Sequence, residues 1–116
     1  MATIYGIPNC DTIKKARAWL AEAGVDAAFH DYRKQGVDAA MLEGWADRVG
    51  WERLLNRAGT TFRKLPDEAK ADLTREKALA LMLANPSAIR RPILVHGDAL
   101  EVGFDPARYV EVFGGA

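Results

Sequence analysis

The fold of this chain is decided near its start, by residues 3–16 with the sequence TIYGIPNCDTIKKA. The first part of this stretch is a short apolar run typical of a buried strand, and the polar residues after it open an amphipathic helix. Cys10 lies at the junction, in the first turn of the predicted helix. The stretch therefore predicts a strand, a turn and a helix, with a cysteine at the helix N-terminus.

Cys10 is the one cysteine of the 116 residues. A helix N-terminus presents unpaired N–H groups and about half a positive charge, which favour a thiolate over a thiol and lower the cysteine pKa. Lys14 and Lys15 add positive charge one turn further on. A buried structural cysteine is the alternative, because a free thiol packs well in a core. The polar neighbours on either side favour an accessible and reactive thiol.

Composition limits the function classes. Sixteen basic residues balance sixteen acidic ones, so direct nucleic-acid binding is not expected. The chain starts without a signal peptide and has no apolar run long enough to cross a bilayer, so we expect a cytoplasmic protein with no membrane partner. One cysteine cannot form an internal disulfide, which fits a reducing compartment and leaves the thiol for intermolecular chemistry. The length fits a single domain over residues 1–116.

Hydrophobic periodicity predicts a strand at 2–7, a helix at 11–23 and a second strand near 28–32. Helices are predicted to follow the capping residues Asp38 and Thr74 in a helical middle part. Both belong to a helical insertion at about residues 35–86.

Two short strands are predicted at 93–95 and 99–102, joined by a Gly-Asp turn. Asp105 caps a last helix that turns Tyr109, Val110 and Phe113 inward. A βαβ unit followed by a ββα unit is the organisation of a thioredoxin-like sheet. We therefore predict an α/β fold with a thioredoxin-like, four-stranded mixed sheet that carries the helical insertion.

Four further residues carry groups suited to metal or acid–base chemistry. His30 and His96 lie on different elements without the spacing of metal ligands, so no metal is expected. His30 is expected to pack on its strand and His96 to be exposed in a turn. Asp31 and Glu101 lie at strand ends, where unpaired carboxylates are expected to be solvated.

Residues 4–16, IYGIPNCDTIKKA, resemble the active-site segment of the ArsC family, the glutaredoxin-coupled arsenate reductases and their relatives, and especially the YffB-like subgroup. The stretch RRPILV at 90–95, with Gly103 after it, resembles the second signature of that family. GTTFRKL at 59–65 matches as well. The resemblance thus extends over nearly the whole chain.

The resemblance implies that Arg91–Pro92 is a cis peptide bond beside the cysteine and that Arg91 faces the thiolate, whereas Arg90 is expected to be solvated. An arginine there would hold the thiolate and clamp an oxyanion or a carboxylate with two hydrogen bonds. Cys10 and Arg91 are the expected catalytic residues. Residues expected to contact glutathione or substrate are Asn9, Asp11, Thr12, Lys14, Arg57 and Pro92.

The chain departs from the pattern of arsenate-reducing relatives, which resemble one another in having a histidine before the cysteine and three arginines around the oxyanion. Gly6 stands at the histidine position, and Phe104 stands where an arginine follows the glycine. Arg57 lies one residue before the place of another arginine, which Ala58 holds. These departures predict weak arsenate binding in a larger and more apolar pocket.

Two classes of function remain. The first is a thiol oxidoreductase that uses Cys10 alone, with glutathione as co-substrate and glutathione or a glutaredoxin resolving a mixed disulfide. A glutaredoxin-coupled arsenate reductase is the alternative within this class. The second class is a regulator resembling Spx, which contacts RNA polymerase. Its Cys-x-x-Cys switch cannot form here, because Ile13 holds the position of the second cysteine.

Overall fold

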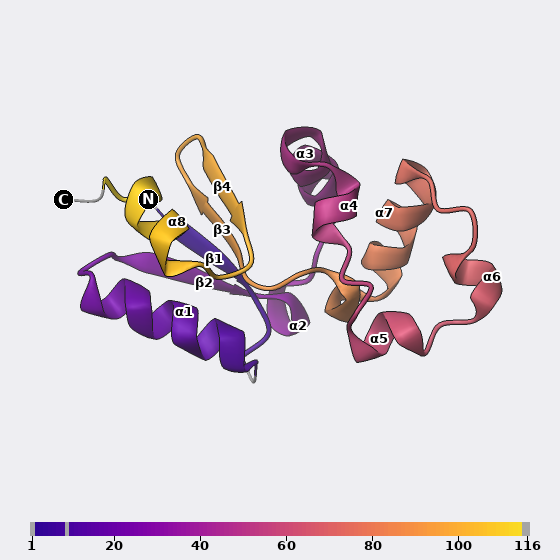
Figure 1. The fold of residues 1–116 in the computed structure, drawn as a ribbon, viewed down its shortest axis with the longest axis horizontal. Helices are drawn as coiled ribbons and strands as arrows, with labels where there is room; N and C mark the ends of the chain where they lie inside the picture. The colour runs from indigo at the N-terminus through magenta and orange to yellow at the C-terminus, as the bar shows by residue number, and fades with distance from the viewer. Residues whose placement is uncertain (1, 9, 115–116) are drawn as a thin grey trace. The chain divides into compact units, whose positions relative to one another are not determined.

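A computed structural model describes residues 2–8 and 10–114 of the chain. These residues form two compact units (Figure 1). The first combines residues 1–35 with 91–116, and the second is Gly36–Arg90. The segment that carries Cys10 and the segment that carries Arg91 thus belong to the same unit, although they lie 81 positions apart in the sequence, the difference of their residue numbers.

The first unit contains a four-stranded sheet with the strand order β2-β1-β3-β4. Its strands are β1 (Ala2–Gly6), β2 (Ala27–Asp31), β3 (Ile93–His96) and β4 (Ala99–Val102). Strand β1 runs parallel to β2 and antiparallel to β3, and β3 pairs antiparallel with β4. This mixed sheet, built from a βαβ and a ββα half, confirms the predicted thioredoxin-like α/β fold.

Two helices, α1 (Asp11–Glu22) and α8 (Pro106–Val112), pack on one face of this sheet (Figure 1). Their shared core joins alternate strand residues to one stripe of each helix, as the two periodicities require. Its fully buried members are Ala2, Ile4, Ala16, Leu20, Leu94 and Tyr109. Burying each of the larger apolar side chains contributes about 1.5–3 kcal/mol.

The last helix differs from its prediction at one position. Tyr109 is buried and Phe113 packs against the same core, but Val110 is 43% exposed. Residues four apart share a helix face, whereas the next residue is turned away by about 100°. The prediction that Val110 faces inward is wrong for this reason.

Strand β2 ends one residue earlier than predicted, because hydrogen bonds turn the chain at Asp31. The Asp31 carboxylate accepts a hydrogen bond from the Arg33 N–H at 2.9 Å, and the Asp31 N–H donates to Gln35 Oε1 at 3.1 Å. The short helix α2 (Tyr32–Gln35) begins there. Tyr32 is therefore the first residue after the strand.

The second unit is helical. Its elements are α3 (Ala39–Val49), α4 (Trp51–Leu54), α5 (Thr60–Arg63), α6 (Asp67–Lys70), α7 (Arg75–Ala84) and the 3-10 helix η1 (Pro86–Ala88). Both predicted caps are confirmed: Asp38 Oδ1 accepts from the Met41 N–H at 2.8 Å, and Thr74 Oγ1 accepts from the Lys77 N–H at 3.2 Å. Such caps each stabilise a helix by about 1 kcal/mol.

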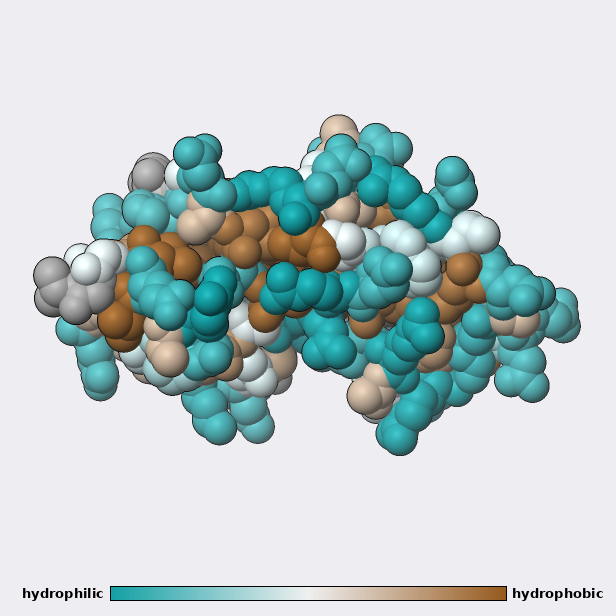
Figure 2. All heavy atoms as spheres, turned by 45° about the horizontal axis from the view of Figure 1, so that its top comes forward, coloured by the Kyte–Doolittle hydropathy of each residue, from teal (hydrophilic) through white to brown (hydrophobic). Residues whose placement is uncertain are grey.

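Most of the surface in the view of Figure 2 is hydrophilic, with apolar side chains showing between the polar ones. Among residues 2–8 and 10–114, no helix combines the length and the apolar character that crossing a membrane requires.

Candidate functional site

Cys10 occupies the N-cap position of α1, with the extended backbone angles φ −97° and ψ 128°. Its carbonyl accepts the first helical hydrogen bond, from the Lys14 N–H at 3.0 Å. The side chain is half-buried and is a free thiol. The turn after β1 therefore delivers the sulfur directly to the N–H groups of the first helical turn.

Several groups act on the pKa of the Cys10 thiol. Burial raises it, but the N–H groups of Ile13 and Thr12 and the guanidinium of Arg91 outweigh burial and leave the pKa below its ordinary value. The uncharged side chain makes no capping hydrogen bond of its own, as expected for a thiol, which is a weak acceptor. The N–H groups and the guanidinium thus favour the thiolate specifically.

Arg91 reaches this site from the segment before β3. It acts on Cys10 both as a hydrogen-bond donor and as a positive charge. The Arg91–Pro92 peptide bond is cis, as the family resemblance implied. Pro92 is fully buried, and its carbonyl accepts a hydrogen bond from the Gly103 N–H at 2.9 Å. Arg90 is exposed, which confirms the prediction for that residue.

We expect the rate of Cys10 alkylation by iodoacetamide to rise with pH around a midpoint below the ordinary cysteine value of about 8.5. Only the thiolate attacks, so protonation at lower pH removes the reactive form. Stopped-flow or mass-spectrometric measurement of the rate between pH 5 and 10 gives the midpoint. A midpoint at or above the ordinary value would make Cys10 a structural residue.

The remaining predicted contacts differ in placement. Asp11 and Lys14 are exposed on the first turn of α1, and neither Lys14 nor its neighbour Lys15 is among the main influences on Cys10. Asn9 lies outside the described residues. Arg57 belongs to the second unit, where it is exposed and its guanidinium carbon lies 5.8 Å from the centroid of the Trp51 ring.

Gly6 does not leave an open space, contrary to the predicted larger and more apolar pocket. A Cβ atom at this position would lie 2.2 Å from Ile13 Cδ1 and 2.9 Å from Ile13 Cγ1, which is closer than atoms can approach. Ile13 is fully buried. Phe104 packs instead against Tyr109, with ring centroids 5.0 Å apart, next to the core under α1 and α8. The glycine thus allows the close approach of α1 to β1.

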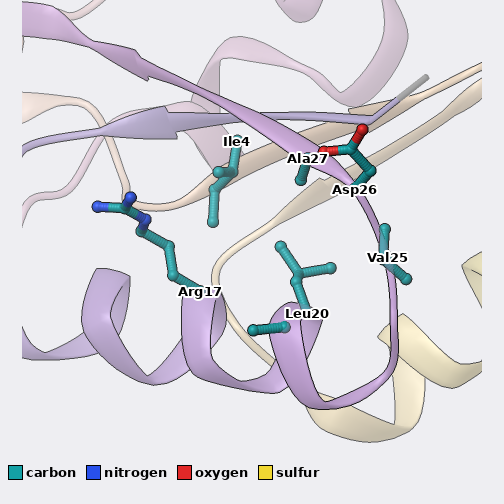
Figure 3. A pocket seen from close by; sticks show the side chains of 7 residues that line it. Ile4, Arg17, Leu20, Val25, Asp26 and Ala27 are labelled. Atoms are coloured by element: carbon teal, nitrogen blue, oxygen red, sulfur yellow. The ribbon is translucent and has the colours of Figure 1, made fainter.

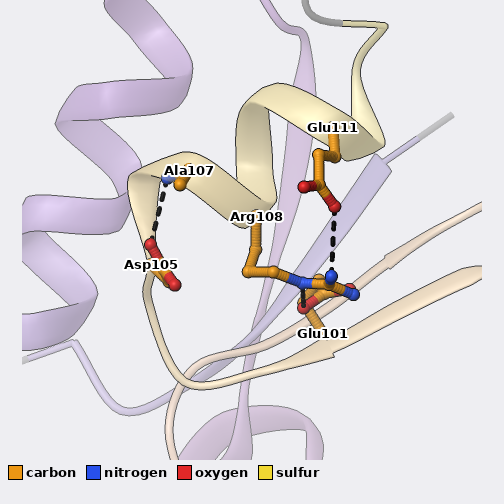
Figure 4. A network of polar contacts seen from close by, with 5 residues as sticks. All are labelled: Glu101, Asp105, Ala107, Arg108 and Glu111. Atoms are coloured by element: carbon orange, nitrogen blue, oxygen red, sulfur yellow. Dashed lines mark hydrogen bonds and ion pairs between the residues drawn. The ribbon is translucent and has the colours of Figure 1, made fainter.

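Glu101 is buried rather than solvated. Its carboxylate accepts two hydrogen bonds from Arg108, from Nε at 3.2 Å and from Nη2 at 3.1 Å, and Arg108 Nη1 also pairs with Glu111 at 3.0 Å (Figure 4). In the same figure, Asp105 caps α8 by accepting from the Ala107 N–H at 3.0 Å. This pairing makes Glu101 a structural group.

Two other sequence predictions fail in a similar way. Asp31 is buried and not solvated, because its carboxylate is used in the turn that begins α2. His96 ends β3 and is half-buried, with its ring centroid 4.8 Å from that of Phe113. His30 packs on its strand as predicted, 4.9 Å from the ring of Tyr5.

Sequence reasoning missed Tyr32, which extends this aromatic row. Its ring lies 6.2 Å from that of His30, and its side chain is 3% exposed. Burial raises the pKa of Tyr32 far above the ordinary tyrosine value; Tyr5 adds to the rise and Arg91 opposes it. The signal in the sequence was the aromatic residue two positions after His30, directly after the end of β2.

A hollow of about 210 Å³ lies between α1 and β2 (Figure 3). Its lining residues are Ile4, Arg17, Leu20, Ala21, Val25, Asp26 and Ala27. It contains neither predicted catalytic residue. Within the described parts of the chain, no group of three or more His, Cys, Asp or Glu side chains is arranged to hold a metal ion.

The site and fold agree with the class of protein that the comparisons give, a thioredoxin-like protein of the ArsC type. The ArsC family model matches residues 5–112. The chain therefore belongs to the ArsC family.

Two solved structures resemble the chain over nearly its whole length. The YffB protein is 51% identical with a TM-score of 0.94, over 97% of this chain and 98% of that one. An arsenate reductase (ArsC) related protein from Brucella melitensis is 54% identical with a TM-score of 0.77, over 97% and 93%.

Two curated relatives were also found. A protein of uncharacterised function from Haemophilus influenzae is 39% identical, over 97% of this chain and 99% of its own length. The global transcriptional regulator Spx of Enterococcus faecalis is 29% identical, over 90% of this chain and 80% of its own length.

Proposed function

We propose that the protein is a glutathione-dependent thiol oxidoreductase that uses Cys10 as its single reactive thiol. The observation that carries this proposal is the placement of the Cys10 sulfur at the N-terminus of α1, where first-turn N–H groups and Arg91 lower its pKa. A thiolate in this position is a nucleophile at neutral pH. No second cysteine exists in the chain, so an external thiol must complete the reaction.

The proposed reaction has two exchange steps. The Cys10 thiolate attacks the glutathione sulfur of a mixed disulfide R–S–S–G, forms a Cys10–glutathione disulfide and releases R–S⁻, which takes up a proton. A glutathione thiolate then attacks the glutathione sulfur on Cys10, which yields oxidised glutathione and regenerates the Cys10 thiolate. Arg91 stabilises the thiolate in both its attacking and its leaving role.

The other proposed contacts serve substrate binding. The N–H of Thr12 acts on the sulfur, and Asp11 and Lys14 are exposed in the first turn of α1. We assign glutathione contacts to these three residues and also to Asn9. Glutathione or a glutaredoxin is the resolving partner, which fits a cytoplasmic location because that compartment is reducing.

We expect oxidised glutathione to add about 305 Da, the mass of one glutathione less two hydrogens, to Cys10 and nowhere else, because the protein has one thiol. Intact-protein and peptide mass spectrometry at pH 7 measures the addition. Reduced glutathione should then remove it.

Cys10→Ser is the control and should take up no glutathione while its circular dichroism spectrum stays unchanged. Catalysis is tested with a glutathionylated peptide, reduced glutathione and a coupled assay for oxidised glutathione. A protein whose Cys10 is never labelled would contradict the proposal.

Arsenate reduction is the second candidate within the same chemistry, and the similarity to the Brucella melitensis arsenate reductase related protein favours testing it. Arg91 offers a cation for an oxyanion beside Cys10, but Gly6 lies where the arsenate-reducing relatives carry a histidine. An oxyanion needs most of its donors to offset its desolvation. Arsenate with glutathione and glutaredoxin should therefore be turned over slowly, and efficient turnover would favour this candidate.

A regulatory function is the third candidate, because relatives named as the regulator Spx cover most of the chain. Such a protein would act by binding RNA polymerase and not by turnover. Ile13 leaves no partner thiol for a switch within this chain. Stable copurification with RNA polymerase, from cells in which Cys10 is never glutathionylated, would favour this candidate.

A further inference from the structure

Among the described residues of the first unit, two buried hydroxyls, those of Tyr32 and Tyr109, have no hydrogen-bond partner. Tyr32 is 3% exposed, and its hydroxyl oxygen is out of contact with both solvent and any hydrogen-bonding group. Leaving a buried hydroxyl unpaired is costly, and a phenylalanine would fill the same volume without that cost. Packing alone therefore does not account for the hydroxyl of Tyr32.

The end of β1 connects Tyr32 to Arg91. Gly6, the last residue of β1, pairs with Asp31, and Tyr32 directly follows Asp31. A Cβ atom at Gly6 would lie 4.0 Å from Arg91 Cβ. Tyr32 and Arg91 thus lie near the same end of β1.

Electrostatic effects agree with this placement. Burial raises the pKa of Tyr32, and the charge of Arg91 acts against that rise. The same charge lowers the pKa of Cys10. Tyr32 remains an uncharged hydroxyl throughout the neutral pH range, with an oxygen able to accept a hydrogen bond. A guanidinium carries five N–H donors, so Arg91 can donate to the Cys10 thiolate in one state and to the Tyr32 hydroxyl oxygen in another.

We propose that Tyr32 is a positioning residue whose hydroxyl oxygen accepts a hydrogen bond from Arg91 when Cys10 has become part of a mixed disulfide. This inference rests on the proposed function. The thiolate holds Arg91 in the reduced protein. In the first exchange step Cys10 forms a new S–S bond, the negative charge departs on the leaving thiolate, and the attraction between Arg91 and the Cys10 sulfur ends.

Tyr32 then supplies the acceptor that the guanidinium has lost. Its hydroxyl is unpaired in the reduced protein because its partner arrives only after the first exchange. The hydrogen bond stabilises the mixed disulfide relative to the thiolate. It also keeps Arg91 beside the sulfur, where the charge is needed again when the Cys10 thiolate leaves in the second step.

Alkylation of Cys10 with iodoacetamide tests this assignment without glutathione, because the resulting thioether is uncharged like the disulfide. Tyr32→Phe should lower the Tm of the alkylated protein by about 4 °C or more and leave the Tm of the reduced protein equal or higher. In glutathione buffers, the same change should lower the equilibrium constant for the mixed disulfide about tenfold.

Tyr109→Phe is the matched control. Tyr109 also has a buried, unpaired hydroxyl, but it lies in α8, in the core shared with α1. Its replacement should change the Tm of the reduced and alkylated proteins by the same amount. A second control is Tyr32→Phe in an Arg91→Gln background, where the extra effect on the alkylated protein should disappear.

The proposal is overturned if Tyr32→Phe shifts the two Tm values equally, or if the difference persists without Arg91. Failure of glutathione to label Cys10 would instead overturn the proposed function. In that case the Tm values of the reduced and alkylated proteins still test the role of Tyr32, because that comparison does not use glutathione.

Discussion

Replacing Gly6 by alanine should lower the free energy of unfolding by about 1–3 kcal/mol, the usual cost of forcing extra volume into a packed core. The added Cβ would lie 2.2 Å from Ile13 Cδ1, and Ile13 is fully buried. Either Ile13 leaves its rotamer or α1 moves away from β1. Urea denaturation followed by circular dichroism measures the change.

Two variants make this prediction specific. Gly44→Ala adds a Cβ in helix α3 where nothing lies within 4 Å, so it should raise stability by about 0.5–1 kcal/mol. Ile13→Val removes Cδ1, the nearer of the two Ile13 atoms that the new Cβ would strike. In that background Gly6→Ala should cost clearly less. An equal cost with and without Cδ1 would show that the contact with Ile13 is not the cause.

The contact between Gly6 and Ile13 also explains why the histidine of arsenate-reducing relatives cannot simply be introduced at position 6. From the sequence, Gly6→His with Phe104→Arg is predicted to shift preference toward arsenate. In the structure, the first change drives a side chain into Ile13 and the second removes an aromatic ring that packs on Tyr109. We therefore expect this double variant to be destabilised and not to bind arsenate better.

Features governed by nearby residues could be predicted from the sequence. The caps at Asp38, Thr74 and Asp105 depend on side chains two or three positions from the N–H groups they accept. The placement of Cys10 at the start of α1 depends on a turn of a few residues. The position of Arg91 was also correct, but it came from the family resemblance, because no local pattern relates Arg91 to Cys10.

Features governed by distant contacts could not be predicted. Glu101 is buried because Arg108 from the next helix pairs with it, and a lone carboxylate at a strand end gives no sign of that partner. The need for glycine at position 6 arises from the distance between a strand and a helix. Tyr32 became a candidate only when its hydroxyl was found buried without a hydrogen-bond partner, because such burial depends on contacts that form only in the folded chain.

Arg91→Gln should raise the pKa of Cys10 and slow its reaction with oxidised glutathione at pH 7 about 3- to 10-fold. Burial already raises this pKa, so removing the hydrogen bond and charge of Arg91 leaves only the N–H groups of Ile13 and Thr12 to oppose it. A charge-assisted hydrogen bond at a half-exposed site contributes about 0.5–1.5 kcal/mol, which corresponds to that range of rates.

The pH profile separates this effect from a loss of structure. For Arg91→Gln, the midpoint of alkylation should move to higher pH while the rate at the alkaline plateau, where all of the thiol is ionised, stays near that of the unmodified protein. A damaged site would lower the plateau as well. Arg90→Gln is the matched control, because Arg90 is exposed and adjacent in sequence, and it should change neither the midpoint nor the rate. Equal effects of the two variants would mean that Arg91 has no special relation to Cys10 and that the thiolate depends on the α1 N-terminus alone.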